Sequence, residues 1–289
     1  GTESAFEVLA RAKELERQGR SIVHLEIGEP DYETPAHIKQ AAKQALDDGA
    51  THYGPSAGLP ELREAVAQHI SAANGISVTP DQGGVPVPIP LREESGFQFD
   101  LDVFERRVSA KTKLIILNSP ENPTGGVLDA GQIRRVAEIA AERRIPVLTD
   151  EIYRHFLYEG AFTSISNLPG MADLTIILDG FSKSYAMTGW RLGFGVMPLP
   201  LADHITRLMV NSNSCTASFV QYGGIAALQG DQSSVTTMVA EFKRRRDLMV
   251  AGLNALPNVS CVTRGGAFYV FTNITKTGLS AAEIAGRLL

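Results

Sequence analysis

The middle of the chain carries three short and almost continuously apolar runs of residues. They lie at 113–117, 145–149 and 174–178. Their length suits strands that are buried on both faces better than it suits helices. Strands of this kind belong to parallel sheets that helices cover on both sides. The hydrophobic pattern therefore predicts an α/β fold with a mostly parallel sheet sandwiched by helices.

A segment with helical periodicity connects the first two of these runs. The apolar positions on its one face are Ile133, Val136, Ala137 and Ala140. Asp129 stands just before the segment and can cap it, so we expect a helix that runs on to Arg144. A strand, a helix and a further strand form the repeating unit of α/β domains.

The flanking parts of the chain have a different pattern and predict a second, smaller α+β domain. Helices are expected at 1–20, 36–47 and 60–72, and strands at 259–262 and 267–271, while the segment 21–27 leads into a turn at 28–31. We expect a large domain over 30–250. The small domain would be discontinuous and formed by 1–29 together with 251–289.

Composition narrows the possible partners. The 289 residues are 44% hydrophobic and 20% charged, with a net charge of −5 and a pI of about 5.7. This acidic balance favours neither nucleic acid nor an anionic membrane surface as a partner. The two cysteines, Cys215 and Cys261, form no disulfide framework and no metal-ligand pattern, which is typical of a cytoplasmic protein.

Polar side chains follow each of the three central strands. Asn122 comes after the first strand, Asp150 ends the second, and Lys183 lies beyond the third. In parallel sheets covered by helices, ligands bind outside the carboxyl ends of the strands. The sequence therefore predicts a binding site at this edge of the sheet.

Lys183 is the most informative of these residues. Most lysines are solvated surface residues, but a lysine at the end of a buried strand can lose its proton and condense with an aldehyde. Ser182 and Arg191 lie in the same run and can bind a phosphate. A Schiff-base lysine with a phosphate anchor is what pyridoxal 5′-phosphate (PLP) requires of a protein.

Four segments together resemble the aspartate aminotransferase family, the class I/II aminotransferases of fold-type I. They are Gly28-Glu-Pro-Asp31, Asn118-Ser-Pro-Glu-Asn-Pro-Thr-Gly125, Thr149-Asp-Glu-Ile-Tyr153 and Phe181-Ser-Lys-Ser-Tyr-Ala-Met-Thr-Gly-Trp-Arg191. The resemblance runs in order over most of the chain. It implies the PLP-dependent transferase fold, with PLP bound in the large domain, and a homodimer whose two active sites share residues.

The resemblance also implies roles for the residues around the ring of the cofactor. Lys183 would hold PLP as a Schiff base and then act as general base and acid. Asp150 would pair with the pyridine nitrogen, and Asn122 and Tyr153 would hydrogen-bond the phenolic oxygen. Purely structural roles for these residues stay open: Asp150 can cap a helix, Asn122 can form a turn, and Tyr153 can be a packed aromatic residue.

Further roles concern the phosphate and the substrate. Arg191 and Ser182 would bind the phosphate, although neither carries much signal on its own. Tyr53 would reach the cofactor phosphate of the partner subunit, or else only pack in its loop. Gly28 would lie beside the substrate carboxylate together with Asn122; the alternative is a glycine that only a tight turn requires.

The implied reaction moves an amino group between an L-amino acid and a 2-oxo acid with ping-pong kinetics. Aspartate and a broad aromatic and aliphatic range are both open as substrates. A PLP-dependent β-lyase on the same fold is an alternative, and so is a non-catalytic regulator with an aminotransferase-like domain. No segment before Gly28 resembles a DNA-binding unit.

The family pattern breaks in two places. Gln82 is followed at once by Gly83, where the family has a further strand, a helix that cups the phosphate and a residue stacked on the ring. The sequence also stops at Leu289, before the arginine that clamps the substrate carboxylate in the family. We therefore expect the sequence to be part of a longer protein and to lack a passage at 82/83.

Overall fold

A computed structural model describes residues 5–24, 30–52, 59–62, 64–65, 87–212 and 214–288 of the chain. The junction between Gln82 and Gly83, where we expect a segment of the family to be missing, lies outside these residues. Gly28 and Tyr53 lie outside them as well.

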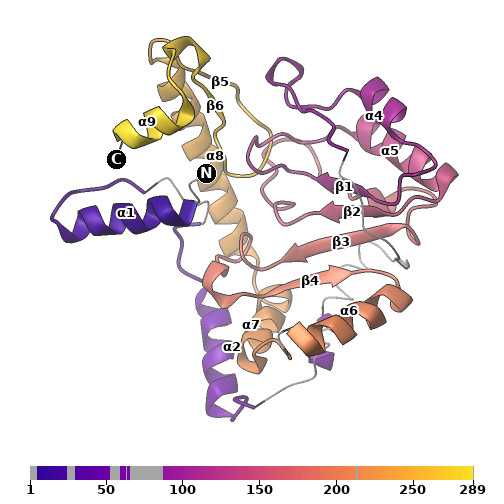
Figure 1. Cartoon of the computed structure of the whole chain (residues 1–289). Coiled ribbons are helices and arrows are strands. Elements are labelled where there is room, and N and C mark those ends of the chain that lie inside the picture. Colours follow the sequence, from indigo (N-terminus) through magenta and orange to yellow (C-terminus); the bar gives the residue numbers. More distant parts are fainter. Residues whose placement is uncertain are drawn as a thin grey trace.

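A four-stranded sheet in the order β1-β2-β3-β4 forms the centre of the molecule (Figure 1). Its strands are β1 (Ile115–Asn118), β2 (Val147–Asp150), β3 (Thr175–Gly180) and β4 (Gly193–Val196). The first three strands run parallel, and β4 pairs with β3 in the antiparallel direction. The mostly parallel sheet predicted from the apolar runs is thus confirmed.

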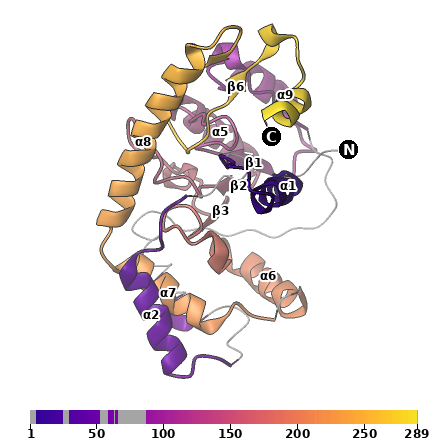
Figure 2. The ribbon, with the colours of Figure 1, turned by 90° about the vertical axis from the view of Figure 1, so that its left-hand side faces the viewer.

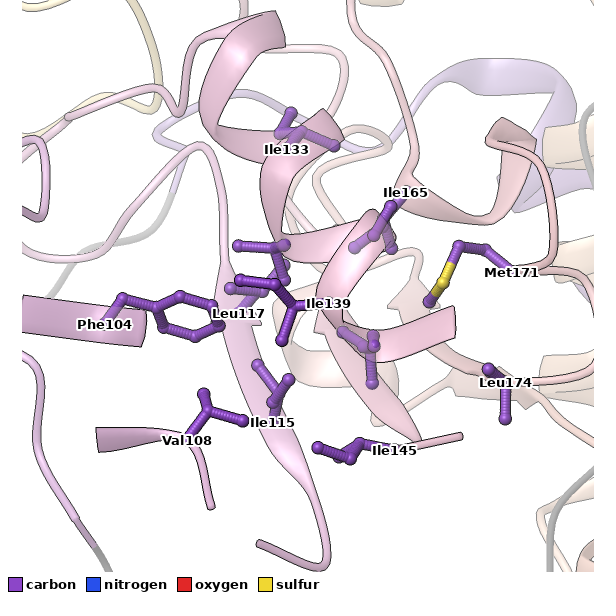
Figure 3. Packing of buried hydrophobic residues seen from close by; sticks show 14 of the residues in the cluster. Phe104, Val108, Ile115, Leu117, Ile133, Ile139, Ile145, Ile165, Met171 and Leu174 are labelled. Atoms are coloured by element: carbon purple, nitrogen blue, oxygen red, sulfur yellow. The ribbon is translucent and has the colours of Figure 1, made fainter. Parts of the chain in front are cut away.

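Helices α4 (Leu101–Arg107) and α5 (Ala130–Arg143) cover one face of β1 and β2. Asp129 caps α5 as predicted, because its carboxylate accepts from the backbone N–H of Gln132 at 2.9 Å. The close view in Figure 3 shows the core beneath these helices, in which Phe104 and Ile139 point toward Ile115 and Leu117.

The β4 edge of the sheet is packed by a second layer of helices, α2 (Ala36–Asp47) and α7 (Ser218–Gln229) (Figures 1 and 2). The buried residues between them and the sheet are Ile38, Leu62, Ile177, Phe181, Tyr185, Met187, Leu192, Val220, Ala227 and Val235. Helix α6 (Leu199–Ser212) follows β4 and leads toward α7. This second core supports the segment that contains Lys183, because Phe181, Tyr185 and Met187 belong to it.

The long helix α8 (Ser233–Asn254) connects the α2/α7 end of the molecule with its C-terminal part (Figure 2). That part contains the antiparallel pair β5 (Ser260–Cys261) and β6 (Thr272–Asn273) and helix α9 (Ala281–Leu288). Helix α1 (Ala5–Arg17) lies at the opposite end of the sequence. The remaining short elements are 3₁₀ turns at Glu93–Ser95, Ile165–Asn167, Thr188–Trp190 and Thr275–Thr277.

Most of the elements predicted for the described residues are present, but the prediction of one strand was wrong. The strand expected at 267–271 is absent, because the backbone bends there and the strand consists of Thr272–Asn273 alone. Ala267 has a φ of 52°, which an extended strand cannot accommodate. The helix expected at 60–72 is seen at 60–62 and 64–65, and its remaining residues are not described. The two-domain division stays a prediction, with its boundary at 250 inside the continuous helix α8.

The two faces of β1 differ sharply in burial. Ile115 faces the α5 core and is 7% exposed, whereas Ile116 on the other face is 68% exposed. Leu178 on β3 is also exposed, at 38%. A parallel sheet normally buries both of its faces, so this side of β1 and β3 is an unusual apolar surface.

These neighbouring isoleucines give a matched pair for a stability test. Ile115→Ala is expected to lower the free energy of unfolding by about 2–5 kcal/mol, because it leaves a cavity in the core. Ile116→Ala removes the same side chain from the same strand and is expected to cost less than about 1 kcal/mol. Urea unfolding of both variants measures the difference, and equal losses would contradict the burial of the two faces.

Candidate active site

The carboxyl ends of β1, β2 and β3 lie next to one another and carry the predicted site residues. Asn118 at the end of β1 is paired in register with Asp150 at the end of β2. The Asn118 side chain accepts a hydrogen bond from the backbone N–H of Asn122 at 3.0 Å, which fixes the loop after β1. Asn122 itself is exposed. The segment with Lys183 follows β3, which pairs with β2 through Leu178 and Asp150.

Asp150 is half-buried and stabilises the turn that follows it. Its Oδ1 atom accepts a hydrogen bond from the backbone N–H of Ile152 at 3.1 Å. Residues 152–155 form turns and no helix, so Asp150 does not cap a helix. The turn nevertheless fixes the orientation of its carboxylate at the strand end.

Tyr153 is a buried aromatic residue with a hydrogen-bonded hydroxyl. This agrees with the alternative in which Tyr153 is a packed aromatic residue. Its side chain is 3% exposed, and its hydroxyl lies 2.5 Å from the hydroxyl of Tyr269. Burial raises the pKa of Tyr153, and the bond to Tyr269 acts in the same direction. The Asn122 side chain acts against this rise as a hydrogen-bond partner of the same hydroxyl. The structure therefore brings Asn122 and Tyr153 together.

Lys183 lies half-buried in a compact loop between β3 and the 3₁₀ turn at Thr188–Trp190. Backbone bonds close this loop, including one from the N–H of Met187 to the carbonyl of Ser182 at 3.2 Å. The Thr34 hydroxyl also donates to the carbonyl of Ala186 at 2.6 Å. The Nζ atom of Lys183 lies 5.7 Å from the ring centre of Phe268. The amine of Lys183 thus lies beside the aromatic ring of Phe268.

Arg191 occupies the far end of the same segment. It is exposed, it has a φ of 54°, and its Nη1 atom donates to the carbonyl of Thr188 at 2.8 Å. A residue other than glycine at positive φ is unusual, and such conformations gather at functional sites. Arg191 also lines an open hollow of about 700 Å³ between its own turn and the start of α7. Ser182 is half-buried beside Lys183 in the same loop.

A buried charged cluster beneath the strand ends was not predicted from the sequence. Its members are Glu151, Arg154 and Asp179. Nη1 of Arg154 lies 3.7 Å from the Glu151 carboxylate and 3.8 Å from the Asp179 carboxylate. Glu151 has no exposed side-chain surface and accepts from the Ser164 hydroxyl at 2.6 Å. Burial raises the pKa of Glu151, and it raises the pKa of Asp179 to about 7. Two buried carboxylates thus share one guanidinium next to Asp150.

The raised pKa of Asp179 predicts a pH dependence of stability. In the unfolded chain an aspartate loses its proton near pH 4, about three pH units below the folded value. Between these values the folded state binds more protons, so the free energy of unfolding falls as the pH rises, by up to about 1.4 kcal/mol per pH unit.

Asp179→Asn removes this contribution and keeps an oxygen that can accept from the N–H of Gly180. Denaturant unfolding at several pH values should show the variant gaining stability over the wild type from about pH 4 to about pH 7, and no further gain above. A difference that is the same at every pH would contradict the buried carboxyl.

Two further aromatic side chains reach the site from beyond α8. The Phe268 ring lies 5.4 Å from the Tyr153 ring, centre to centre, in addition to its position near Lys183. Tyr269 makes the hydroxyl contact with Tyr153. The signal for them was the apolar run at 267–271, which we interpreted as a strand. The structure thus brings Asn122 and Tyr153 together, and the Phe268 ring lies near both the Tyr153 ring and the amine of Lys183.

The sequence and the fold of the chain match known proteins. The family model described as aminotransferase class I and II matches residues 20–83 and 76–289. The chain belongs to the class I and II aminotransferases. Its activity is that of a transaminase, and the lyase and regulator alternatives are not favoured.

Individual relatives agree with the family assignment. An aspartate aminotransferase of Pyrococcus abyssi is 37% identical, over 93% of this chain and 81% of its own length. An aromatic-amino-acid aminotransferase of Thermococcus litoralis is also 37% identical, over 91% and 79%. The solved aspartate aminotransferase of Thermus thermophilus with maleate superimposes with a TM-score of 0.88 at 32% identity, covering 95% of this chain and 83% of that one. These neighbours confirm the fold-type I architecture.

The part of the chain that the structure describes contains neither a candidate membrane-spanning helix nor a candidate metal site. Among those residues, no helix combines the length and the apolar character needed to cross a membrane. The same residues hold no group of three or more side chains suited to a metal ion.

Proposed function

We propose that this transaminase uses PLP as its cofactor and that the strand ends of β1, β2 and β3 form its binding site. The observation that carries the proposal is the meeting of an amine, a carboxylate and a buried phenol at one edge of the sheet, on Lys183, Asp150 and Tyr153. The chemistry of these donors fits the aldehyde, the pyridine nitrogen and the phenolic oxygen of PLP. When bound, PLP withdraws electrons from the α-carbon of the amino acid so that a proton can leave it.

Each residue of the chain then has a defined task. Lys183 binds the cofactor covalently and, once released by the substrate, carries the proton away from the α-carbon and returns it. Asp150 keeps the pyridine nitrogen protonated, and Asn122 and Tyr153 orient the phenolic oxygen. Arg191, exposed at the hollow next to α7, binds the phosphate together with Ser182.

The substrates are proposed to be an L-amino acid and a 2-oxo acid. Relatives bear the names of aspartate and of aromatic-amino-acid aminotransferases, so aspartate and aromatic amino acids are the first donors to test. Gly28 and Asn122 are proposed to lie beside the substrate carboxylate. Of these two, Gly28 is outside the described residues.

A homodimer is proposed, with Tyr53 reaching the partner's cofactor phosphate. Helix α6 supports it, because its side chains of Leu199, Leu208 and Val210 are 72%, 65% and 51% exposed. Several large apolar side chains exposed along one helix favour a surface that a second subunit covers. The cytoplasm is the proposed compartment.

We also propose that the sequence lacks a passage at 82/83. The family model matches in two parts that meet between residues 76 and 83. The alignment with the P. abyssi relative extends over 316 positions, more than the 289 residues of this chain, so that relative has residues without a counterpart here. The exposed face of β1 and β3, with Ile116 and Leu178, is the surface that such a passage would cover.

The experiment incubates the purified protein with PLP, aspartate or phenylalanine, and 2-oxoglutarate as amine acceptor. The proposal predicts glutamate together with the 2-oxo acid of the donor, in equal amounts and without free ammonia. Ammonia release that needs no acceptor would instead identify a lyase. No turnover and no cofactor absorbance band would refute the PLP site.

A further inference from the structure

The segment 264–269 reaches back from the C-terminal part of the chain to the active site. Three backbone hydrogen bonds hold it there. They run from Tyr158 N–H to the carbonyl of Gly265 (2.8 Å), from Ala267 N–H to Phe156 (2.8 Å), and from Gly266 N–H to Gly125 (3.2 Å). The segment is thus fixed to the loops that follow both β1 and β2.

Gly266 shows how closely the segment approaches the loop after β1. A Cβ atom at this position would lie 2.6 Å from Cβ of Pro120 and 2.8 Å from Cγ2 of Val127. Only glycine permits such an approach. Ala267, the next residue, has a positive φ of 52°. These two positions bend the chain so that the next two side chains, Phe268 and Tyr269, both face Tyr153.

The contact between the two tyrosines is short and partly buried. Their hydroxyl oxygens lie 2.5 Å apart, and their rings meet nearly edge to face, at 77°. Burial raises the pKa of both phenols, so both keep their protons at neutral pH. One proton lies between the two oxygens, and the other is available for a further acceptor.

The direction of this bond depends on what else Tyr153 binds. When Tyr153 donates its proton to an acceptor at the strand ends, its oxygen is left to accept, and Tyr269 becomes the donor. A hydroxyl that accepts a hydrogen bond donates more strongly, because a chain of hydrogen bonds polarises each of its members. Tyr269 can therefore change how strongly Tyr153 donates, without touching the acceptor.

We propose that Tyr269 is a positioning residue that donates its hydroxyl proton to Tyr153 and thereby strengthens Tyr153 as the donor to the phenolic oxygen of PLP. This inference rests on the proposed function. The charged groups near the pair are Asp150 at the end of β2 and Lys183, whose amine lies by the Phe268 ring. The Phe268 ring contacts the Tyr153 ring, and Asn122 shares the Tyr153 hydroxyl.

The test compares Tyr269→Phe with wild type, both loaded with PLP, by titrating the visible absorbance of the bound cofactor against pH. A donor to the phenolic oxygen stabilises the form of the cofactor–lysine unit that has lost its proton, so weakening the donor raises the pH midpoint. We expect a rise of roughly half a pH unit, which corresponds to part of one hydrogen bond.

Tyr158→Phe is the matched control. Its hydroxyl is also buried, but it has no hydrogen-bond partner among the residues that the structure describes, so its loss should leave the midpoint in place. Tyr153→Phe supplies the second background. There, adding Tyr269→Phe should shift the midpoint no further, because the residue through which Tyr269 acts is gone.

The outcomes separate the inference from the proposed function. A wild-type protein that gives no cofactor band refutes the PLP site itself. A normal band with the same midpoint in wild type and Tyr269→Phe refutes the role of Tyr269 alone. A Tyr269→Phe shift of equal size in the wild-type and Tyr153→Phe backgrounds would also overturn it, since the effect would then be a general structural one.

Discussion

Lys183→Ala is expected to lower kcat for amino transfer by at least about a thousandfold, because it removes both the covalent attachment of the cofactor and the general base. The loop that carries Lys183 is held by its own backbone bonds and by Thr34, so the change should leave the fold intact. Steady-state kinetics with saturating PLP measures the loss.

Lys276→Ala is the control for this variant. Lys276 lies in an exposed 3₁₀ turn of the C-terminal part, away from the strand ends. It should keep the wild-type kcat. If Lys183→Ala retained more than about a tenth of the activity, Lys183 would not be the general base of this enzyme.

Asp150→Asn is expected to lower kcat by about a hundredfold to a thousandfold, because a neutral amide no longer stabilises positive charge on the pyridine nitrogen. Asparagine keeps the oxygen that accepts from the backbone N–H of Ile152, so the local turn is preserved. The covalent attachment through Lys183 remains. PLP should therefore still bind, and its absorbance band should persist while turnover falls.

Asp100→Asn provides the matched substitution outside the site. Asp100 caps α4 and accepts from the N–H of Val103, a task that asparagine also performs. Its kcat should not change. An unchanged kcat in Asp150→Asn would show that Asp150 does not act on the pyridine ring.

The regular elements of the large sheet could be predicted because local signals and tertiary packing agree. The apolar runs became β1, β2 and β3, and the helical pattern after Asp129 became α5 with its cap in place. Short apolar runs joined by an amphipathic helix admit few arrangements other than a parallel sheet. The antiparallel direction of β4 was not predicted.

The parts of the site that were missed depend on contacts between distant segments. The run at 267–271 has the composition of a strand, but its conformation is set by Gly266 against Pro120 and by the bond of Ala267 to Phe156. Tertiary packing of this kind overrides local propensity. The sequence shows Phe268 and Tyr269 as apolar residues and does not show which side chains they face.

The charged cluster was missed for the same physical reason. Glu151, Arg154 and Asp179 are ordinary charged residues in the sequence, and residues of these types are exposed in most proteins. Their burial results from the packing of distant parts of the chain around the strand ends. It raises the pKa of both carboxyls, which no local pattern reveals.

The most direct test of the account is to locate the cofactor on the chain. The protein is incubated with PLP, reduced with borohydride and digested, and the modified peptide is sequenced by mass spectrometry. The account predicts that the reduced cofactor is attached to Lys183 in stoichiometric amount and that aspartate or phenylalanine added before borohydride prevents the attachment. Attachment spread over exposed lysines, or at a single lysine other than Lys183, would contradict it.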